Sequence, residues 1–201
     1  ENLTMELFGP GEGPSGINDG TACAYMPGFT KDVDADTHFP SEIVTYTFGI
    51  SNLTVDTFTG LSLVDTLTYD ANWISDSVAV QPNCTGSFTS IGTGDLLGGT
   101  PEVSLDQKTL RITDMVVPSA SQTCFSIQAQ ILSDAQAEKV SNQASLTNLP
   151  STFGITLYSD FPSSIVPNDA TPHTILAGVN VGDFIFEDQN GNGVYQPGNG
   201  D

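Results

Sequence analysis

Positively charged residues are scarce in this sequence. Only four lysines and arginines stand against 24 aspartates and glutamates, which gives the 201-residue chain a formal net charge of −20. Nucleic acids and anionic membrane surfaces bind proteins through basic patches. The charge therefore argues against both as partners, and it suits a surface that is exposed to an extracellular medium rich in cations.

Long apolar runs and metal-binding cysteine spacings are also missing. No stretch approaches the roughly 20 apolar residues of a transmembrane helix, so we expect no membrane insertion. The cysteines are Cys23, Cys84 and Cys124; one is left over after any pairing, and no C-x-x-C spacing predicts zinc. His38 and His173 are far apart in the sequence and have no nucleophile motif beside them, and we expect His38 in a solvated loop. The sequence therefore predicts no enzyme.

What the chain does contain is a succession of short β-strand patterns. In residues 43–50, apolar side chains alternate with threonine and glycine, which is typical of a strand with one buried face. The only segment of helical composition, residues 133–139, is too short to be more than a turn. Short strands broken by Gly, Pro, Asn and Asp predict an all-β fold, an antiparallel β-sandwich. The other expected strands are 29–33, 61–67, 73–80, 87–91, 108–117, 123–132, 139–146 and 153–158.

The two ends of the chain differ from this pattern. Residues 1–8 alternate like a strand and lead into a Gly/Pro-rich linker, so we expect an extended segment over 1–27. Residues 188–193 read D-x-N-x-N-G, the first half of a calcium-binding loop. The loop would hold Ca²⁺ through oxygens at its first, third, fifth, seventh and twelfth positions, and the twelfth is an asparagine here. The candidate ligands are Asp188, Asn190, Asn192, Val194 (backbone carbonyl), Asn199 and Asp201.

Between these ends, five short motifs occur in a recognisable order. They are a Phe-Thr-Lys at 29–31, VTYTFGISN at 44–52, LVDTL at 63–67, NQASLT at 142–147, and the acidic pieces SDFP and NDAT between 159 and 171. From about residue 28 to residue 175 the chain therefore resembles the Ig-like conserved repeat domain of bacterial surface and filament proteins. The resemblance implies an Ig-like sandwich over 28–176 and an extracellular, cell-surface or secreted location. Thr68 stands where this family usually has proline.

The resemblance to Ig-like adhesin and pilin domains also implies a role for Lys31, Asp65 and Asn142. In many such domains, a lysine on the first strand is joined to an asparagine on a late strand by an intramolecular isopeptide bond. An apolar pocket favours a neutral amine as nucleophile and a protonated acid that polarises the asparagine carbonyl. The bond requires the first and last strands to lie side by side. The alternative is a solvated Lys31 among aspartates, with Asp65 and Asn142 in ordinary strand-end and loop positions.

The same resemblance implies a disulfide bond between Cys84 and Cys124 on neighbouring strands. Two free thiols in a reducing compartment are the alternative. Cys23 would then be free or would link subunits, and the sequence leaves both possibilities open.

Residues 179–201 resemble the opening of the B-type repeats of serine-aspartate-repeat adhesins, in which a strand precedes a D-x-N-x-N-G loop. Residues 1–8 resemble the strand that follows this loop, so a partial repeat over 177–201 would be completed by a neighbouring copy or an adjacent repeat through strand addition. The sequence thus predicts an extracellular stalk or filament subunit, stabilised by calcium and covalent bonds. The alternative is an adhesin domain that binds a host or surface ligand through loops such as 92–101.

Overall fold

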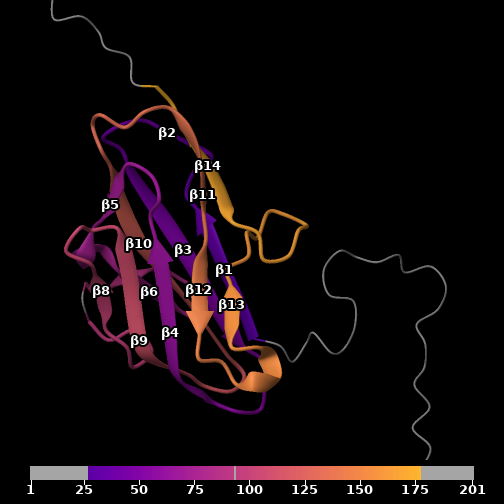
Figure 1. Cartoon of the computed structure of the whole chain (residues 1–201). Helices are drawn as coiled ribbons and strands as arrows, with labels where there is room; N and C mark the ends of the chain where they lie inside the picture. Colours follow the sequence, from indigo (N-terminus) through magenta and orange to yellow (C-terminus); the bar gives the residue numbers. More distant parts are fainter. Residues whose placement is uncertain (1–26, 93, 178–201) are drawn as a thin grey trace, which may run out of the picture.

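The computed structural model describes residues 27–92 and 94–177, and these residues fold almost entirely into β-strands (Figure 1). Two short 3₁₀ turns, η2 (Ser75–Ser77) and η3 (Ser151–Phe153), are the only helical pieces among them, and none of the described helical segments is long enough to cross a membrane. The strands are β1 (Pro27–Val33), β2 (Thr37–His38), β3 (Ile43–Asn52), β4 (Phe58–Thr66), β5 (Ala71–Trp73), β6 (Ala79–Pro82), β7 (Thr89–Ser90), β8 (Pro101–Val103), β9 (Thr109–Val117), β10 (Ser121–Ile131), β11 (Glu138–Asn142), β12 (Ala144–Thr147), β13 (Thr156–Tyr158) and β14 (Thr171–Ile175).

Two antiparallel sheets form the sandwich, and a third small sheet lies at one end of it. One large sheet has the order β1-β3-β10-β6-β7 with β5 also paired to β10, and the other has the order β13-β12-β4-β9-β8. The third sheet, β11-β14-β2, lies at the top of Figure 1. Its β14–β2 pair is parallel, and all other strand pairs are antiparallel. The expected Ig-like antiparallel β-sandwich is confirmed.

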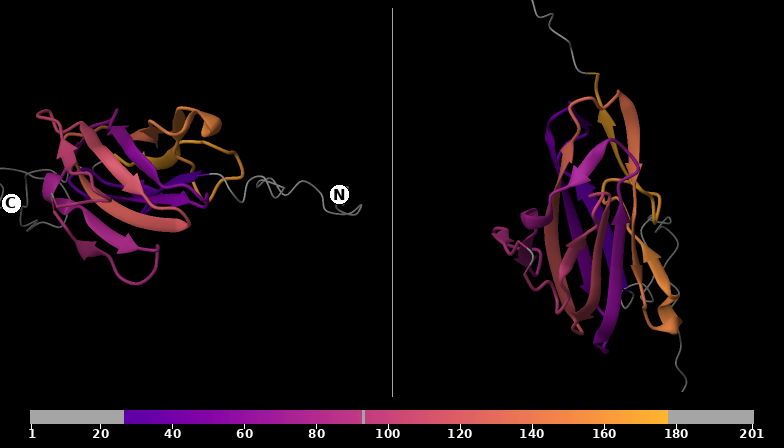
Figure 2. Two further views of the ribbon diagram at one scale, coloured as in Figure 1. Left: turned by 90° about the horizontal axis from the view of Figure 1, so that it is seen from below. Right: turned by 60° about the vertical axis from the view of Figure 1, so that its left-hand side comes forward.

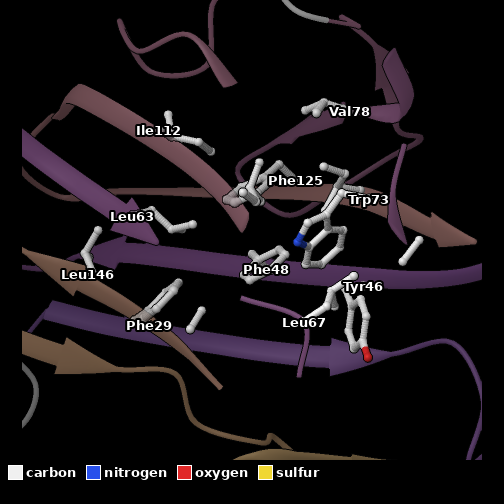
Figure 3. Packing of buried hydrophobic residues seen from close by; sticks show 14 of the residues in the cluster. Phe29, Tyr46, Phe48, Leu63, Leu67, Trp73, Val78, Ile112, Phe125 and Leu146 are labelled. Carbon is white, nitrogen blue, oxygen red and sulfur yellow. The ribbon is translucent and has the colours of Figure 1, made fainter. Parts of the chain in front are cut away.

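Strand β3 is the centre of the first sheet because both of its edges are paired and one of its faces is apolar. It pairs with β1 on one side and with β10 along almost its whole length on the other. Its inward residues alternate with half-buried ones, and Tyr46, Phe48 and Ile50 are at most 2% exposed. Figure 3 shows these aromatic side chains packed with Trp73 and Phe125 in the core between the sheets. Trp73 is fully buried in this cluster.

Several expected strands have different bounds in the structure. The stretch 73–80 is broken by η2 into β5 and β6, because residues 74–78 turn the chain between two positions on β10. The stretch 139–146 is split at Gln143, so that β11 belongs to the small sheet and β12 to the second large sheet. Strands β2, β8 and β14 were not expected from the sequence, since each is short or interrupted by proline.

The described chain enters and leaves the sandwich at opposite ends. Strand β1 begins toward the lower end of the domain in Figure 1, and the chain after β14 leaves at the upper end. Figure 2 shows the same separation from two further directions. The expected N-terminal strand and linker, Cys23 and the expected calcium loop fall in segments 1–26 and 178–201, which lie outside the described residues.

Candidate functional site

Lys31 is completely buried in the sandwich. The alternation of β1 turns Phe29 and Lys31 toward the core, and Lys31 has 0% exposure. Its Nζ lies 4.2 Å from the centroid of the Tyr46 ring, 5.4 Å from that of Phe48 and 6.0 Å from that of Trp73. An ammonium over aromatic faces is stabilised electrostatically, but it has lost its hydration. The alternative of a solvated lysine is therefore wrong.

Asp65 reaches the same lysine from the opposite sheet. It lies on β4 with 1% exposure, and Nζ of Lys31 donates a 2.5 Å hydrogen bond to its Oδ2. Burial lowers the pKa of Lys31, and the carboxylate of Asp65 partly opposes this effect. A short contact between an amine and an acid in an apolar pocket allows the proton to pass between them, which leaves both groups neutral.

Asn142 is brought to this pair by the small sheet. It is 2% exposed on β11, where its cross-strand partner is Thr171 of β14. The Thr171 hydroxyl donates a 2.7 Å hydrogen bond to the backbone carbonyl of Lys31. Two residues after Asn142, Ala144 is paired with Asp65. The structure thus gathers Lys31, Asp65 and Asn142 at the place where the three sheets meet.

The route by which Asn142 arrives differs from the expected one. Strands β1 and β11 are not hydrogen-bonded neighbours; β1 pairs with β3, and β11 pairs with β14. The chain breaks after β11, and β11 joins the small sheet, where it pairs with β14. Strand β14 in turn contacts β1 through the hydrogen bond from Thr171 to the Lys31 carbonyl. The first and the last described strand, β1 and β14, therefore lie side by side as expected, whereas Asn142 lies on β11, one strand farther away.

Four buried side-chain atoms lack a hydrogen-bond partner in the part of the chain that the structure describes. They are Asp65 Oδ1, Trp73 Nε1, Asn142 Nδ2 and His173 Nδ1. Buried polar groups are nearly always paired in folded proteins, because each orphaned group costs about 1–3 kcal/mol. All four belong to residues at or next to the Lys31 pocket, so the buried polar atoms without hydrogen bonds in the described fold are concentrated there.

A tyrosine–histidine network covers the pocket on the side of the small sheet. The Tyr46 hydroxyl lies 2.9 Å from the Tyr69 hydroxyl and 2.8 Å from Nε2 of His173. Figure 3 shows this hydroxyl directed out of the apolar cluster. Burial raises the pKa of Tyr46 and of Tyr69 well above the ordinary value, whereas burial and the nearby charges of His38 and Lys31 lower the pKa of His173 to about 4. His173 is therefore neutral at pH 7.

His38 belongs to the same network. Its ring lies edge-on to that of His173, with 5.2 Å between the centroids, and the side chain is only 4% exposed. The expectation of a solvated loop histidine is wrong, because β2 pairs with β14 and turns this side chain inward. Sequence reasoning also missed Tyr46, Tyr69 and His173. The only signal was the period of two, which places Tyr46 on the same strand face as Phe48 and His173 on the same face as Thr171.

Cys84 and Cys124 are joined by a disulfide bond. Cys124 lies on β10 opposite Gln81, and Cys84 lies in the turn that follows β6, so the bond joins two neighbouring strands as the resemblance implied. On the neighbouring strand β3, the cross-strand partner of Cys124 is Gly49. A Cβ at this glycine would lie 2.6 Å from the Thr30 hydroxyl, so the absence of a side chain lets β1, β3 and β10 pack closely here.

No group of three or more His, Cys, Asp or Glu side chains within 27–92 and 94–177 is placed to hold a metal ion. All the expected calcium ligands, Asp188, Asn190, Asn192, Val194, Asn199 and Asp201, lie outside the described residues.

Comparison with known proteins places the fold but not the family. Neither a family model nor a curated protein matches the sequence. Among solved structures, a variant of the major pilin subunit of Bacillus cereus has 11% identity and a TM-score of 0.50, covering 75% of this chain and 40% of the pilin. A collagen-binding domain of a Staphylococcus aureus adhesin has 11% identity and a TM-score of 0.42, covering 73% of this chain and 95% of that domain. The N-terminal domain of a Streptococcus gordonii adhesin has 13% identity and a TM-score of 0.45, covering 75% and 32%. The pilin comparison supports an Ig-like sandwich.

Proposed function

We propose that this chain is an extracellular structural module, a stalk or filament subunit of a bacterial surface protein, and that Lys31 and Asn142 form an isopeptide bond in it. The observation that carries the proposal is the fully buried Lys31–Asp65 pair, together with a buried Asn142 two residues before Ala144, the cross-strand partner of Asp65. A buried ion pair is weak evidence for stability, since an apolar core is often as stable. A chemical role accounts better for a lysine, an acid and an asparagine in one dry pocket.

The expected reaction keeps atoms and charges in balance. Lys31 passes a proton to Asp65, and the neutral amine attacks Cγ of Asn142 while the acid polarises the amide carbonyl. A proton moves from Nζ to Nδ2 through Asp65, the bond from Cγ to Nδ2 breaks, and ammonia leaves. The product is a neutral amide, so the buried ammonium is gone, and Nδ2 of Asn142 no longer needs a partner.

Intact-protein mass spectrometry tests this bond directly. The wild-type chain is expected to be lighter than its sequence by one ammonia after the disulfide has been taken into account. Lys31→Met, Asp65→Ala and Asn142→Ala should each have the full mass of their own sequence. The matched control is Lys139→Met, because Lys139 is an exposed lysine on the same strand as Asn142 and should leave the mass deficit intact. A wild-type mass without the deficit would remove the isopeptide bond from the proposal.

The position of the chain ends supports a module that works in series. Residues 27 and 177 lie at opposite ends of the sandwich, so tension on the flanking segments runs along the domain (Figure 2). The disulfide between Cys84 and Cys124 reinforces one sheet within this unit. We further propose that neighbouring copies or repeats are joined by strand addition between 1–8 and 179–201. Electron microscopy of the full chain should show end-to-end assemblies that are lost when residues 1–8 are deleted.

Calcium binding at 188–201 is part of the same proposal. The ligands would be Asp188, Asn190, Asn192 and Val194, with Asn199 and Asp201 completing the site together with groups of the neighbouring unit. Chelation is expected to expose residues 188–201 to proteases while the sandwich stays folded. Asp188→Asn should reproduce the effect of the chelator, and Asp76→Asn, an exposed position in η2, should not. Unchanged proteolysis on chelation would count against calcium.

A second candidate function is adhesion to a surface ligand. The observation that favours it is a set of exposed apolar side chains on the segment around β13, where Ile155 is 71% exposed, Ile165 is 81% exposed and Val166 is 57% exposed. The expected loop 92–101 is a weaker candidate, because Leu96 turns into the core within it. If adhesion is the function, Ile165→Ser together with Val166→Ser should abolish binding of the chain to host matrix or cell surfaces and leave assembly unchanged.

A further inference from the structure

The tyrosine–histidine network lies beside the Lys31 pocket, and the proposed isopeptide chemistry does not yet account for it. The Tyr46 hydroxyl is its centre, with Tyr69 at 2.9 Å and Nε2 of His173 at 2.8 Å. The Tyr46 ring also faces Nζ of Lys31 at 4.2 Å. The Tyr46 ring thus faces the amine of Lys31, and its hydroxyl contacts His173 on β14, the strand that pairs with β11 and its Asn142.

The hydroxyl of Tyr46 has one hydrogen and two lone pairs. His173 is neutral at pH 7 and can therefore accept the Tyr46 hydrogen at Nε2. Tyr69 then donates to one lone pair of the Tyr46 oxygen. The second lone pair is left over, and it can accept a hydrogen from an amide. In this arrangement the Tyr46 hydrogen is used in the bond to His173, so Tyr46 offers a lone pair, and not a hydrogen, to the Asn142 amide.

The orientation of Asn142 fits this acceptor. Nδ2 of Asn142 and Oδ1 of Asp65 are a donor and an acceptor in one pocket, and neither has a partner. If the amide nitrogen faced the carboxylate, the two atoms would satisfy each other. The nitrogen therefore points away from Asp65 Oδ1. Burial raises the pKa of Tyr46, and the Asn142 amide partly opposes this rise, which fits an amide N–H directed at the Tyr46 oxygen.

We propose that Tyr46, held by His173 and Tyr69, is a positioning residue for the isopeptide reaction, and that it directs the leaving nitrogen of Asn142 toward itself and the amide carbonyl toward Asp65. This inference rests on the proposed isopeptide bond. The carbonyl oxygen gains electron density when Lys31 attacks, so it must face the acid proton of Asp65, and the leaving nitrogen must not occupy that place. If the Asn142 side-chain amide were flipped by 180°, its nitrogen would face Asp65, and Asp65 could not polarise the carbonyl.

The test follows the loss of ammonia over time. The full chain is made by cell-free synthesis, samples are denatured at intervals, and intact-mass spectrometry gives the bonded fraction. Tyr46→Phe keeps the ring over Lys31 and removes the hydroxyl, so bond formation is expected to slow by about 10- to 100-fold, the usual effect of a misplaced reacting group. Tyr158→Phe, which removes an exposed hydroxyl on β13, is the matched control and should react at the wild-type rate.

A second pair of variants separates positioning from folding. His173→Gln places an amide oxygen where Nε2 accepts, and it should restore most of the rate that His173→Leu loses. If Tyr46→Phe does not fold, the His173 pair alone decides the question. Bond formation at the wild-type rate in folded Tyr46→Phe, or equal rates in the two His173 variants, would overturn the role of Tyr46. A wild-type chain that never loses ammonia would overturn the isopeptide bond itself, and with it this inference.

Discussion

Replacing Asp65 with alanine should make the stability of the domain depend steeply on alkaline pH. Among the described residues, the substitution removes the only carboxylate on Nζ of Lys31, and under our proposal it also prevents isopeptide formation. A buried lysine then remains among the rings of Tyr46, Phe48 and Trp73. Burial already lowers the pKa of Lys31, and Asp65 is what opposes it. Without Asp65, we expect the folded protein to hold Lys31 as the neutral amine, because the buried ammonium has no counter-charge.

The cost of that release can be worked out from the ordinary lysine pKa. Deprotonating a lysine of pKa about 10.4 at pH 7 costs roughly 4–5 kcal/mol, at about 1.4 kcal/mol per pH unit. This value is an upper limit for the charge contribution, and it agrees with the roughly 3–5 kcal/mol lost when one partner of a buried pair is removed. Since typical domains have only about 5–15 kcal/mol of stability, the variant should be close to unfolding at neutral pH.

The sign of the pH effect follows from proton counting. The unfolded variant keeps Lys31 protonated up to about pH 10.4, and the folded variant holds it neutral, so the unfolded state binds the extra proton. Stability must therefore rise with pH, by roughly 2–3 kcal/mol between pH 7 and pH 9. It would fall with pH only if the folded state bound the extra proton.

The assay is urea unfolding of Asp65→Ala between pH 7 and pH 9.5, followed by tryptophan fluorescence, since Trp73 is fully buried. The control is the double variant Lys31→Met with Asp65→Ala, which also lacks the bond and the carboxylate but has no amine to titrate. The difference between the two stabilities isolates the lysine. If that difference does not shrink as the pH rises, the account of Lys31 as a desolvated amine is refuted.

Three other changes test further parts of the fold. Burial, and after it the charges of His38 and Lys31, lowers the pKa of His173 to about 4, so the unfolded state takes up a proton near pH 6.5 before the folded state does. As the pH falls from about 6.5 toward 4, the free energy of unfolding of the wild type should therefore decrease by up to about 3 kcal/mol, and that of His173→Gln should not. Replacing Cys84 and Cys124 with serine opens a loop with a sequence separation of 40 residues and should cost about 4 kcal/mol in chemical unfolding. Asn52→Ala removes a buried amide that bonds two carbonyls and Thr54, and should lower stability by roughly 2–4 kcal/mol; Gln122→Ala, at an exposed position of β10, should change it by less than about 0.5 kcal/mol.

The antiparallel β-sandwich could be predicted from the sequence because its long strands each have one buried face. In β3 inward and outward residues alternate along the whole strand, and in β10 they alternate from Ile127 to Ile131, so a period of two identified both strands. For Lys31 the sequence left a solvated position open, although the residue follows the inward-facing Phe29 at a spacing of two. The resemblance to known domains then connected it with Asp65 and Asn142.

The small sheet could not be predicted, and the polar network depends on it. Strand β14 includes Pro172 and only five residues, and β2 has two, so neither produces a clear period in the sequence. Their pairing is parallel and joins residues that are more than 130 positions apart, which no local pattern reports. His38 was misplaced for this reason. Its burial comes from a strand pairing and not from its own neighbours in the chain.

The positions of Lys31 and Asn142 predict how the module responds to force. A bond between them would carry tension from β1 directly to β11, and residues 32–141 would be excluded from the pulled path. Pulling on residues 27 and 177 should then extend about 40 residues, or roughly 140 Å at about 3.5 Å per residue. Without the bond, the disulfide alone shortens the path by its separation of 40 residues, and about 110 residues or roughly 380 Å should extend. Single-molecule force spectroscopy of wild type and Lys31→Met distinguishes these lengths, with Lys139→Met as the control. A wild-type extension near the longer value would mean that tension passes through the whole sandwich and that no covalent bond spans β1 and β11.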